Sequence, residues 1–545
     1  MEGKIIKLGR EAQEKIIEGV RGSVDAIKVT LGPCGKCVAI CQNSMPGEVS
    51  RDGAIVSKSI TYKDPAMNMG AQLVRDAATL TESEAGDSTS TTSILIKEMI
   101  DRGQKAIISK SNANEVKSGM LKAGKWMTEY IKSKAISVDG DLEKIRKVAT
   151  ISANNDSEVG DLIVKCMEKV GEDGIITAEL SSDLDTTIDI TTGMKLDRGW
   201  SNPNFVTSPE SGKCEMDNPY IAVIGEKISS VPQILPLIQD IMKEGRPFLI
   251  VCDDMDEVVN STLVINTLQG AIRCCVVKGI DFGDGRKNIL QDIATACGGT
   301  YVCTENGVSL NDMGLEHLGE AKKVIVSKDN TIIFEGGGDP EKIKSRVEIL
   351  KTRLNDPSTS QYDKTKFSKR IANLCGGIAI IKAGGATEVE KINRKNTIED
   401  SILASKSALS EGCCSGSGYT FLKGSLDVKK DKDFWKTLEG DEAVGANVVF
   451  ESLPIILETV ATNALGDEKK AGVVLSEVMK SKKENWGYNA KTKKYCDLVE
   501  EGVLDSAKAL RVALENAIST ASMILLTDCV ILDEEEESDC SCHIK

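Results

Sequence analysis

The loop Gly86 to Thr92 (Gly-Asp-Ser-Thr-Ser-Thr-Thr) has the residue types of a phosphate-binding site. It separates two stretches of helical periodicity, and exposed amides and the helix dipole at the start of the second helix favour an anion. Asp87 beside that anion indicates a magnesium ligand, because Mg²⁺ commonly uses one or two carboxylates plus phosphate oxygens. No Gly-Lys-Ser/Thr follows, so the loop is not a Walker A loop. Taken alone, the loop is explained more simply as a capped helix start without a ligand.

Three other glycine-containing segments could approach a ligand. Thr30-Leu31-Gly32-Pro33 is a second candidate phosphate loop, although by itself it is only a helix stop. Gly416-Ser417-Gly418 could let backbone approach a ligand, but Gly-Ser loops are common. Gly336-Gly337-Gly338-Asp339-Pro340 lies in a polar stretch and is typical of a surface turn.

The histidine and cysteine content argues against several kinds of catalytic site, metal site and disulfide framework. The only two histidines, His317 and His543, make Ser-His-Asp catalysis and multi-histidine metal sites implausible. Hydrolysis would have to use carboxylates, hydroxyls, backbone amides and a carboxylate-bound metal. The 17 cysteines are an odd, scattered set and do not resemble a disulfide framework. We interpret Cys34-Gly-Lys-Cys37 as coincidental thiols, and Cys540-Ser-Cys542-His543 is weak evidence for a metal site.

Composition describes an ordinary globular chain of several domains. It has 545 residues, 41% of them hydrophobic and 28% charged, and a net charge of −15. The acidic balance argues against a general nucleic-acid binder, which needs a basic face. No uninterrupted apolar run reaches about 18 residues, so we expect no membrane-spanning helix. The first residues lack the apolar core of a signal peptide, so we expect a cytoplasmic protein.

The predicted elements divide the chain into helical ends and an α/β middle. Segments before about 134 and after about 410 are mainly helical and are expected to form one domain, with the middle inserted between them. Gly193 and Gly376-Gly377 lie near the boundaries of the insertion and are predicted hinges. Expected strands are 38–40, 49–56, 221–224, 248–251 and 378–381, and expected helices include 1–30, 65–85, 94–131, 231–243 and 257–269.

An ordered series of motifs, nearly constant in spacing, runs from about residue 4 to about residue 530 and resembles the group I chaperonins of the GroEL type. The motifs are Thr30-Leu31-Gly32-Pro33, Arg51-Asp52-Gly53, Met69-Gly70-Ala71-Gln72, Gly86-Asp87 with its threonines, Thr150-Ile151-Ser152-Ala153-Asn154, Asp197-Arg198-Gly199, Phe282-Gly283-Asp284, Leu290-Gln291-Asp292-Ile293-Ala294, Gly384-Gly385-Ala386-Thr387-Glu388, Glu399-Asp400 and Tyr488-Asn489-Ala490.

The resemblance implies a multidomain fold. Residues 1–134 and 411–545 would form a mainly helical equatorial ATP-binding domain, 135–191 and 378–410 a small α+β intermediate hinge domain, and 192–377 an inserted α/β apical domain that binds substrate. It further implies an ATP-driven chaperone that captures non-native polypeptides and folds them in the cavity of a homo-oligomeric ring. The ring would be a single or double heptamer, closed by a GroES-like co-chaperonin, with ATP, Mg²⁺ and K⁺ as ligands.

The resemblance also assigns roles to residues. Asp87 would hold the metal, while Asp52 and Asp400 would be catalytic and orient the attacking water. Placing Asp400 on a moving domain would couple hydrolysis to closure. Nucleotide-binding residues would be Thr30, Leu31, Gly32, Pro33, Arg51, Asp87, Ser88, Thr89, Ser90, Thr91, Ile151, Ser152, Gly416, Ser417, Asn489, Ala490 and Asp505. Substrate-binding residues would be Trp200, Asn204, Phe205, Leu235, Ile238, Asn260, Leu263, Val264 and Ile265.

Several residues depart from the family pattern. Ser88 replaces a glycine of the phosphate loop and could strain it or slow turnover, and Ser417 interrupts a glycine triplet. Arg51 stands where lysine is usual, and a planar guanidinium is not a compact ammonium. Asn204 and Asn260 are polar where the family is apolar, which predicts a narrower or weaker client range. A passive holdase or scaffold with a decayed ATPase is therefore the alternative function.

Overall fold

The computed structural model describes residues 4–41, 48–138, 141–153, 156–171, 175–181, 183–208, 212–279, 283–304, 307–355 and 377–533, with 363, 366–367, 370–371 and 373–374 between the last two ranges. The chain divides into two compact units. Unit 1 comprises residues 1–164, 180–186 and 383–545, and unit 2 comprises residues 165–179 and 187–382. The inserted α/β module expected from the sequence corresponds to unit 2, and the three-domain division stays a prediction.

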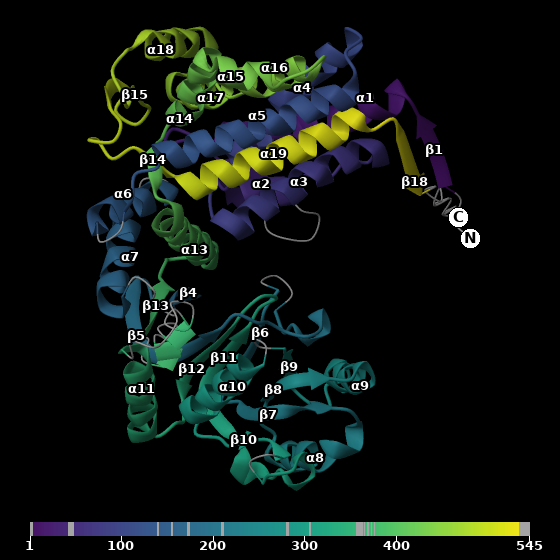
Figure 1. Cartoon of the computed structure of the whole chain (residues 1–545), viewed down its shortest axis with the longest axis vertical. Helices are drawn as coiled ribbons and strands as arrows, with labels where there is room; N and C mark the ends of the chain where they lie inside the picture. Colours follow the sequence, from purple (N-terminus) through teal and green to yellow (C-terminus); the bar gives the residue numbers. More distant parts are fainter. Residues whose placement is uncertain are drawn as a thin grey trace, which may run out of the picture. The chain divides into compact units, whose positions relative to one another are not determined.

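Unit 1 is mainly helical and is built from both ends of the chain (Figure 1). Its helices are α1 (Arg10–Ile27), α2 (Gly53–Ser59), α3 (Pro65–Ala85), α4 (Thr89–Ile108), α5 (Ala113–Lys134), α6 (Leu142–Ser152), most of α7 (Ser157–Val170), α13 (Glu388–Glu411), α14 (Tyr419–Asp427), α15 (Lys432–Lys436), α16 (Glu442–Ser452), α17 (Ile455–Leu465), α18 (Glu468–Lys480) and α19 (Ala507–Leu526). Its strands form two-stranded antiparallel pairs. They are β1 (Lys4–Leu8) with β18 (Cys529–Asp533), β2 (Val38–Ile40) with β3 (Glu48–Ser50), β14 (Cys413–Ser415) with β17 (Leu504–Ser506), and β15 (Trp486–Asn489) with β16 (Lys494–Asp497).

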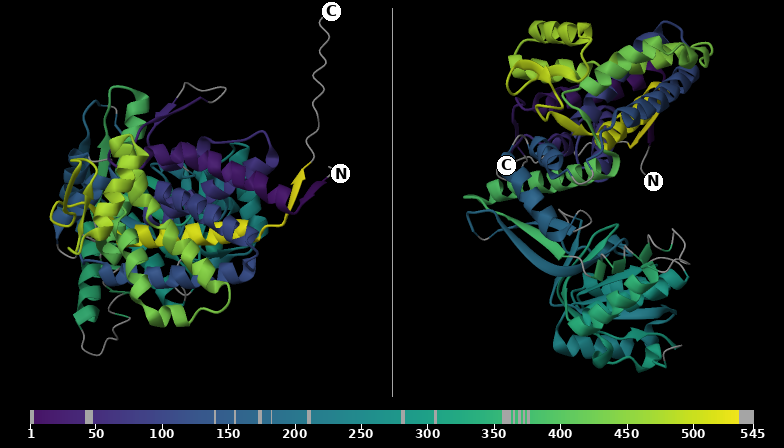
Figure 2. Two further views of the ribbon diagram at one scale, coloured as in Figure 1. Left: turned by 90° about the horizontal axis from the view of Figure 1, so that it is seen from above. Right: turned by 60° about the vertical axis from the view of Figure 1, so that its left-hand side comes forward.

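The core of unit 1 follows from amphipathic spacing. Ile16, Val20, Val24 and Ile27 recur at helical intervals on α1 and are all buried. Pro65 occupies the first turn of α3, and Asp64 caps that helix by accepting from two backbone amides. Helix α19, from the C-terminal end, contacts α3, α4 and α5 from the N-terminal end (Figures 1 and 2). The two ends of the chain therefore share one hydrophobic core.

Pairs of glycines allow two helix crossings to bring backbone against backbone. A Cβ on Gly19 of α1 would lie 1.9 Å from the Met67 carbonyl oxygen of α3, and one on Gly70 of α3 would lie 2.1 Å from the Ile16 carbonyl oxygen. Gly119 of α5 and Gly445 of α16 make the same reciprocal approach, each with a Cβ position 1.9 Å from a carbonyl oxygen of the other helix. Any side chain at these positions would push the helices apart.

Unit 2 is built on a ten-stranded sheet in the order β4-β13-β5-β12-β11-β7-β8-β9, with β10 beside β7 and β6 beside β11. Strands β7, β8 and β9 pair in parallel, whereas β13-β5, β5-β12, β12-β11 and β11-β7 pair antiparallel. The strands are β4 (Ile175–Leu180), β5 (Thr187–Leu196), β6 (Cys214–Asp217), β7 (Tyr220–Ile228), β8 (Phe248–Met255), β9 (Cys274–Lys278), β10 (Tyr301–Val302), β11 (Gly319–Val326), β12 (Thr331–Gly336) and β13 (Gly377–Ala383). The helices are α8 (Leu235–Glu244), α9 (Glu257–Leu268), α10 (Asp284–Cys297) and α11 (Pro340–Asn355).

Four local expectations differ from the structure. The helix expected over 1–30 begins at Arg10, and residues 4–8 form strand β1 instead. The helix expected over 94–131 is divided into α4 and α5, with a break at residues 109–112. Residues 53–59 form helix α2 instead of continuing the strand expected over 49–56, because Asp52 caps a helix by accepting from the Ala54 amide at 2.8 Å. The helix expected over 231–243 begins at Leu235, after a 3₁₀ turn at Val231–Gln233.

Two of the predicted hinge glycines, Gly193 and Gly377, lie inside the sheet of unit 2. The chain passes between the units at 164/165, 179/180, 186/187 and 382/383, and none of these points coincides with Gly193 or Gly377. Gly193 permits close strand packing, since a Cβ there would lie 2.0 Å from Ile378 Cδ1. Gly376 lies outside the described residues. The hinge role of these glycines stays a prediction.

Two helical stretches, Glu442–Leu465 and Ala507–Leu526, are long and apolar enough to span a membrane by length and composition. More than half of each is buried inside the protein, as in core helices, and the first is interrupted at Pro454 between α16 and α17.

Of the fourteen cysteines within the described ranges, none forms a disulfide and nine are buried, as is typical of reduced thiols that pack as small apolar residues.

We predict that Gly70→Ala lowers the free energy of unfolding by about 1–3 kcal/mol, because the added methyl meets the backbone of α1. Urea unfolding followed by circular dichroism measures the change. Gly472→Ala on α18 is the matched control, because nothing lies within 4 Å of its Cβ position. The control should be neutral or stabilising by up to about 1 kcal/mol. Equal destabilisation by both substitutions would contradict the close-crossing explanation.

Candidate functional site

A cavity of about 830 Å³ in unit 1 gathers most of the site residues predicted from the sequence. It is lined by segments that are far apart in the chain, among them the start of α4, the end of α6, the middle of α13 and the β15–β16 hairpin. The predicted residues that line it are Thr30, Leu31, Gly32, Pro33, Arg51, Asp52, Asp87, Ser88, Thr89, Ser90, Thr91, Ile151, Ser152, Asp400, Ser417, Asn489, Ala490 and Asp505. Gly416 lies directly behind this lining.

The loop between α3 and α4 forms one end of the cavity. Gly86 ends α3 with a φ of 72°, and its close packing against Leu403 of α13 leaves no room for a side chain. Ser88 follows in the left-handed conformation with a φ of 70°, which is unusual for a residue other than glycine. The first turn of α4 then begins at Thr89 and leaves its amides free of helical partners. This geometry suits a phosphate group, as the loop sequence predicts.

Carboxylates cluster beside this helix start. Asp87 and Asp400 are half-buried in the cavity wall, and desolvation raises the pKa of both carboxyls; the nearby Asp52 carboxylate raises them further. Glu82 and Asp87 add to the raised pKa of Asp400. A divalent cation among these groups would relieve the repulsion, so the donor set fits Mg²⁺. Within the described ranges no group of three or more Asp, Glu, His or Cys side chains is placed to hold a metal ion by itself.

Arg51 brings a fixed positive charge to the same end of the cavity. Its guanidinium donates to the carbonyl oxygens of Gly32 and Pro33 at 2.9 and 2.8 Å. Its Nε is buried without a hydrogen-bond partner. The two carbonyls orient the planar fork, and Nε–H remains available as a donor.

Asp505 and the β15–β16 hairpin form the other end. Asp505 lies on β17 opposite Cys414, and a Cβ on Gly416 would lie only 2.9 Å from its Oδ1, so glycine is required there. Burial, with a smaller contribution from Asp87, raises the pKa of Asp505 to about 7. Asn489 Oδ1 accepts from the amides of Lys491 and Thr492 at 3.0 and 3.2 Å, which leaves its Nδ2 for a ligand.

The cavity also contains polar residues that the sequence prediction missed. Asn393, Asn396 and Thr397 of α13 precede Asp400 by seven, four and three residues, which is one face of a helix. Helical periodicity around Asp400 could therefore have identified them. Thr150 also lines the cavity and belongs to the motif at residues 150–154, although no role was predicted for it. Lys147, Lys491 and Thr492 line the cavity too, and no local motif distinguishes them.

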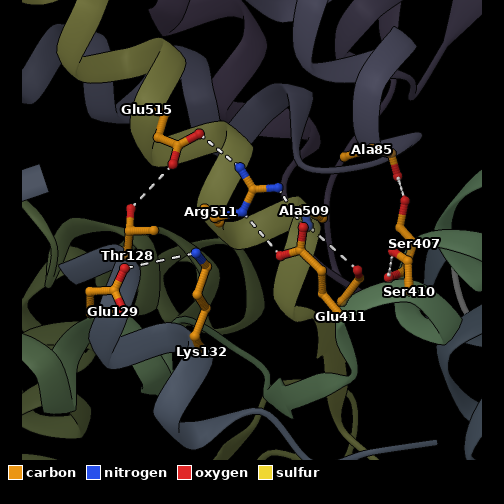
Figure 3. A network of polar contacts seen from close by, with 11 residues as sticks. Ala85, Thr128, Glu129, Lys132, Ser407, Ser410, Glu411, Ala509, Arg511 and Glu515 are labelled. Atoms are coloured by element: carbon orange, nitrogen blue, oxygen red, sulfur yellow. Dashed lines mark hydrogen bonds and ion pairs between the residues drawn. The ribbon is translucent and has the colours of Figure 1, made fainter. Parts of the chain in front are cut away.

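Helix α13, which carries Asp400, is held to the core of unit 1 by polar contacts near its end (Figure 3). Arg511 of α19 donates to both oxygens of Glu411 at 2.5 and 3.0 Å, and to Glu515 at 2.9 Å. Ser407 donates at 2.9 Å to the carbonyl of Ala85, the residue before Gly86. These contacts connect the helix of Asp400 directly to the loop of Asp87.

The substrate-binding residues predicted in unit 2 are divided between its surface and its core. Leu235 and Ile265 are 43% and 53% exposed on α8 and α9. Trp200 is partly buried and Asn204 is exposed. Phe205, Ile238, Asn260, Leu263 and Val264 are buried, so the predicted binding residues include core positions as well as surface positions. Asn260, for example, accepts a hydrogen bond from the Ser201 hydroxyl at 2.9 Å.

Further exposed apolar residues extend these two helix faces. Met242 lies seven residues after Leu235 on α8 and is 49% exposed. Val258 and Leu268 share a face of α9 with Ile265, at 72% and 66% exposure. We name Leu235, Met242, Val258, Ile265 and Leu268 the apolar surface of α8 and α9.

We predict that Asp505→Asn stabilises the nucleotide-free protein at pH 7.5 and has little effect near pH 4. The folded-state pKa of Asp505 is raised to about 7, above its ordinary value of 3.8. Between those values the unfolded chain binds fewer protons, so the carboxyl lowers stability increasingly as pH rises, and asparagine removes this cost. Thermal unfolding of both proteins from pH 4 to 7.5 measures it. A difference in melting temperature that does not grow with pH would contradict the assignment.

Comparison with known proteins places this architecture in a family. The model of the TCP-1/cpn60 chaperonin family matches residues 24–535. Among solved structures, the fold is similar to the crystal structure of the chaperonin gp146 from the bacteriophage EL 2 (Pseudomonas aeruginosa), obtained in the presence of ATP-BeFx. The TM-score is 0.71 at 21% sequence identity, over 97% of this chain and 100% of that chain. The resemblance and the fold expected from the sequence are confirmed, and the chain belongs to the TCP-1/cpn60 chaperonin family.

Proposed function

We propose that this chaperonin is an ATP-dependent folding machine that captures non-native polypeptides and uses ATP binding and hydrolysis to promote their folding. The observation that supports the proposal most strongly is the cavity of unit 1. It brings together a free helix start, a fixed arginine and a cluster of buried carboxylates. Phosphoryl transfer requires positioning and neutralisation of charge more than covalent chemistry, and these groups provide both.

Each residue has a defined task in this proposal. The first-turn amides of α4 and the hydroxyls of Thr89, Ser90 and Thr91 bind phosphate oxygens. Asp87 holds Mg²⁺, which neutralises charge on the phosphates when bound. Asp400, with Asp52, accepts a hydrogen bond from the attacking water and orients it. Desolvation and neighbouring carboxylates raise the pKa of Asp400, and positive charge that enters the cavity would favour its carboxylate form.

The other end of the cavity would bind the nucleoside. Asp505 would accept hydrogen bonds from the ribose hydroxyls, with Gly416 and Ser417 beside the sugar. Asn489 and Ala490 would lie beside the base, where Asn489 Nδ2 would donate to a ring nitrogen.

Client capture is assigned to the apolar surface of α8 and α9. Exposed apolar side chains at helical spacing present a face that non-native chains can bury against. The seven-membered single or double ring, the GroES-like co-chaperonin, K⁺ as a further cation, the cytoplasmic location and the narrower client range remain proposals from the family resemblance.

We predict that Asp400→Ala abolishes most Mg²⁺-dependent ATP hydrolysis by the size-selected oligomer and leaves nucleotide binding measurable. Loss of a positioned general base typically costs about 10²–10⁴-fold in rate. Phosphate release measures turnover, and a fluorescent ATP analogue measures binding. Ser410→Ala, on the same helix but outside the cavity, is the control. Unchanged turnover in Asp400→Ala would contradict its assigned role.

The second candidate function is a passive holdase, and the backbone at Ser88 favours it. A serine in the left-handed conformation is strained by about 1–3 kcal/mol, and it lies in the phosphate loop. We predict that Ser88→Gly raises the rate of ATP hydrolysis severalfold if this strain slows turnover. Steady-state kinetics of the wild type and the variant measure it. Wild-type protein that captures clients without any turnover would support the holdase, and a slower Ser88→Gly variant would contradict the strain explanation.

We predict that the double substitution Leu235→Ser and Ile265→Ser reduces capture of a denatured client at least severalfold, because it removes apolar area from the surface of α8 and α9. Suppression of client aggregation in the absence of nucleotide measures capture. Ile349→Ser is the matched control, because Ile349 is 51% exposed on α11 of the same unit. Equal loss in the control, or no loss in the double variant, would contradict the assignment.

A further inference from the structure

Ser417 combines an unfavourable backbone conformation with a specific hydrogen bond. Its φ is 57°, in the left-handed region that favours glycine, and it is followed by Gly418 with a φ of 72°. Glycine at position 417 would adopt this backbone without strain. We therefore attribute the presence of serine at position 417 to its side chain, whose hydroxyl donates a hydrogen bond to the Tyr488 carbonyl at 2.9 Å.

This hydrogen bond joins two segments that line the cavity. Tyr488 lies on β15, directly before Asn489 and Ala490, and Ser417 lies in the loop between β14 and α14. A second serine strengthens the junction, since Ser415 donates to Asn485 Oδ1 at 2.8 Å at the start of the same hairpin. Two hydroxyls of one short loop thus hold the β15–β16 hairpin.

Among the described residues, Cys34 provides another side-chain link to the hairpin, since its Sγ donates to the Ala490 carbonyl at 3.5 Å. The hairpin's own ladder pairs β15 with β16, and its buried residues Tyr488 and Ala490 pack in a cluster with Tyr419 and Leu457. Apolar packing fixes the distance of the hairpin from the cavity but not its position along the strand direction, because it is non-directional. A hydrogen bond to a single carbonyl fixes that position.

We propose that Ser417 is a positioning residue that holds the base-facing hairpin, residues 486–497, at the register in which Asn489 and Ala490 meet the nucleotide base. The proposal rests on the proposed ATP site and deepens it: base affinity depends on a hydroxyl outside the phosphate loop. The phosphate end, at Asp87 and the first turn of α4, is independent of this contact.

The experiment compares ATP with inorganic tripolyphosphate, each with Mg²⁺, as ligands of the intact oligomer by isothermal titration calorimetry. We expect Ser417→Gly and Ser417→Ala to weaken ATP about fivefold to tenfold, as loss of one hydrogen bond does. Tripolyphosphate, which has no base, should bind both variants as it binds the wild type. In kinetics, KM should rise while kcat is preserved.

Hydrogen exchange of the nucleotide-free protein gives a second readout that needs no ligand. Amides of residues 486–497 should exchange faster in both variants, and amides at the start of α4 should not change. Lys110→Gly is the control, because Lys110 has a φ of 77° and lies outside the cavity. Lys110→Gly removes the strain of a left-handed residue without touching the hairpin. The affinity for ATP and the hydrogen exchange of residues 486–497 should therefore stay at their wild-type values.

Three outcomes would overturn the proposal for Ser417, and a fourth would overturn the proposed function instead. Unchanged exchange of 486–497 in both variants would overturn the proposal, as would equal weakening of ATP and tripolyphosphate. Loss in Ser417→Gly but not in Ser417→Ala would also overturn it, because glycine flexibility would then be the cause. If the wild type itself bound no ATP, the proposed function would fail instead, and the exchange result would still test the hydroxyl.

Discussion

Repulsion among buried carboxylates is the constraint on which the site depends. Asp52, Asp87, Asp400 and Asp505 face one cavity, and burial keeps water from screening them. The fold must therefore hold these groups together against a cost that only a cation or protons can relieve. Arg51 supplies one positive charge, and its guanidinium is fixed on two carbonyls. The raised pKa values of Asp87, Asp400 and Asp505 are consistent with the negative charge that remains uncompensated.

Packing in the rest of unit 1 holds these carboxylates together despite their unfavourable repulsion. Reciprocal glycines bring α1 against α3 and α5 against α16 at backbone contact, and α19 from the far end of the chain completes the core. The Arg511–Glu411 pair and the Ser407 hydrogen bond then fix the end of α13 (Figure 3). Since α13 and α3 meet at Gly86, a movement of the helix that carries Asp400 would be transmitted to the loop of Asp87.

Much of the fold and site could be predicted from the sequence, because periodicity and glycine motifs are local signals. The helical ends, the α/β insertion and the candidate loops at Gly86–Thr92 and Thr30–Pro33 were identified in this way, whereas Asp52, Asp400 and Asp505 were identified only by the resemblance to the family. The strand expected beyond Arg51 was wrong because a single cap at Asp52 outweighed the β-branched residues that follow. Exposure on α8 and α9 could not be predicted, since both faces of each helix are apolar. Lys147 and Lys491 were missed because only the tertiary fold brings them to the cavity.

The central claim is that the carboxylate cluster is built to receive a magnesium nucleotide. Calorimetric titration with Mg·ATP analogue in buffers of different ionisation enthalpy, near pH 6, counts the protons exchanged on binding. The raised pKa values of Asp87 and Asp400 predict net proton release, because Mg²⁺ bound beside these two carboxyls would lower the pKa of both. Binding without proton release, or with proton uptake, would contradict the account.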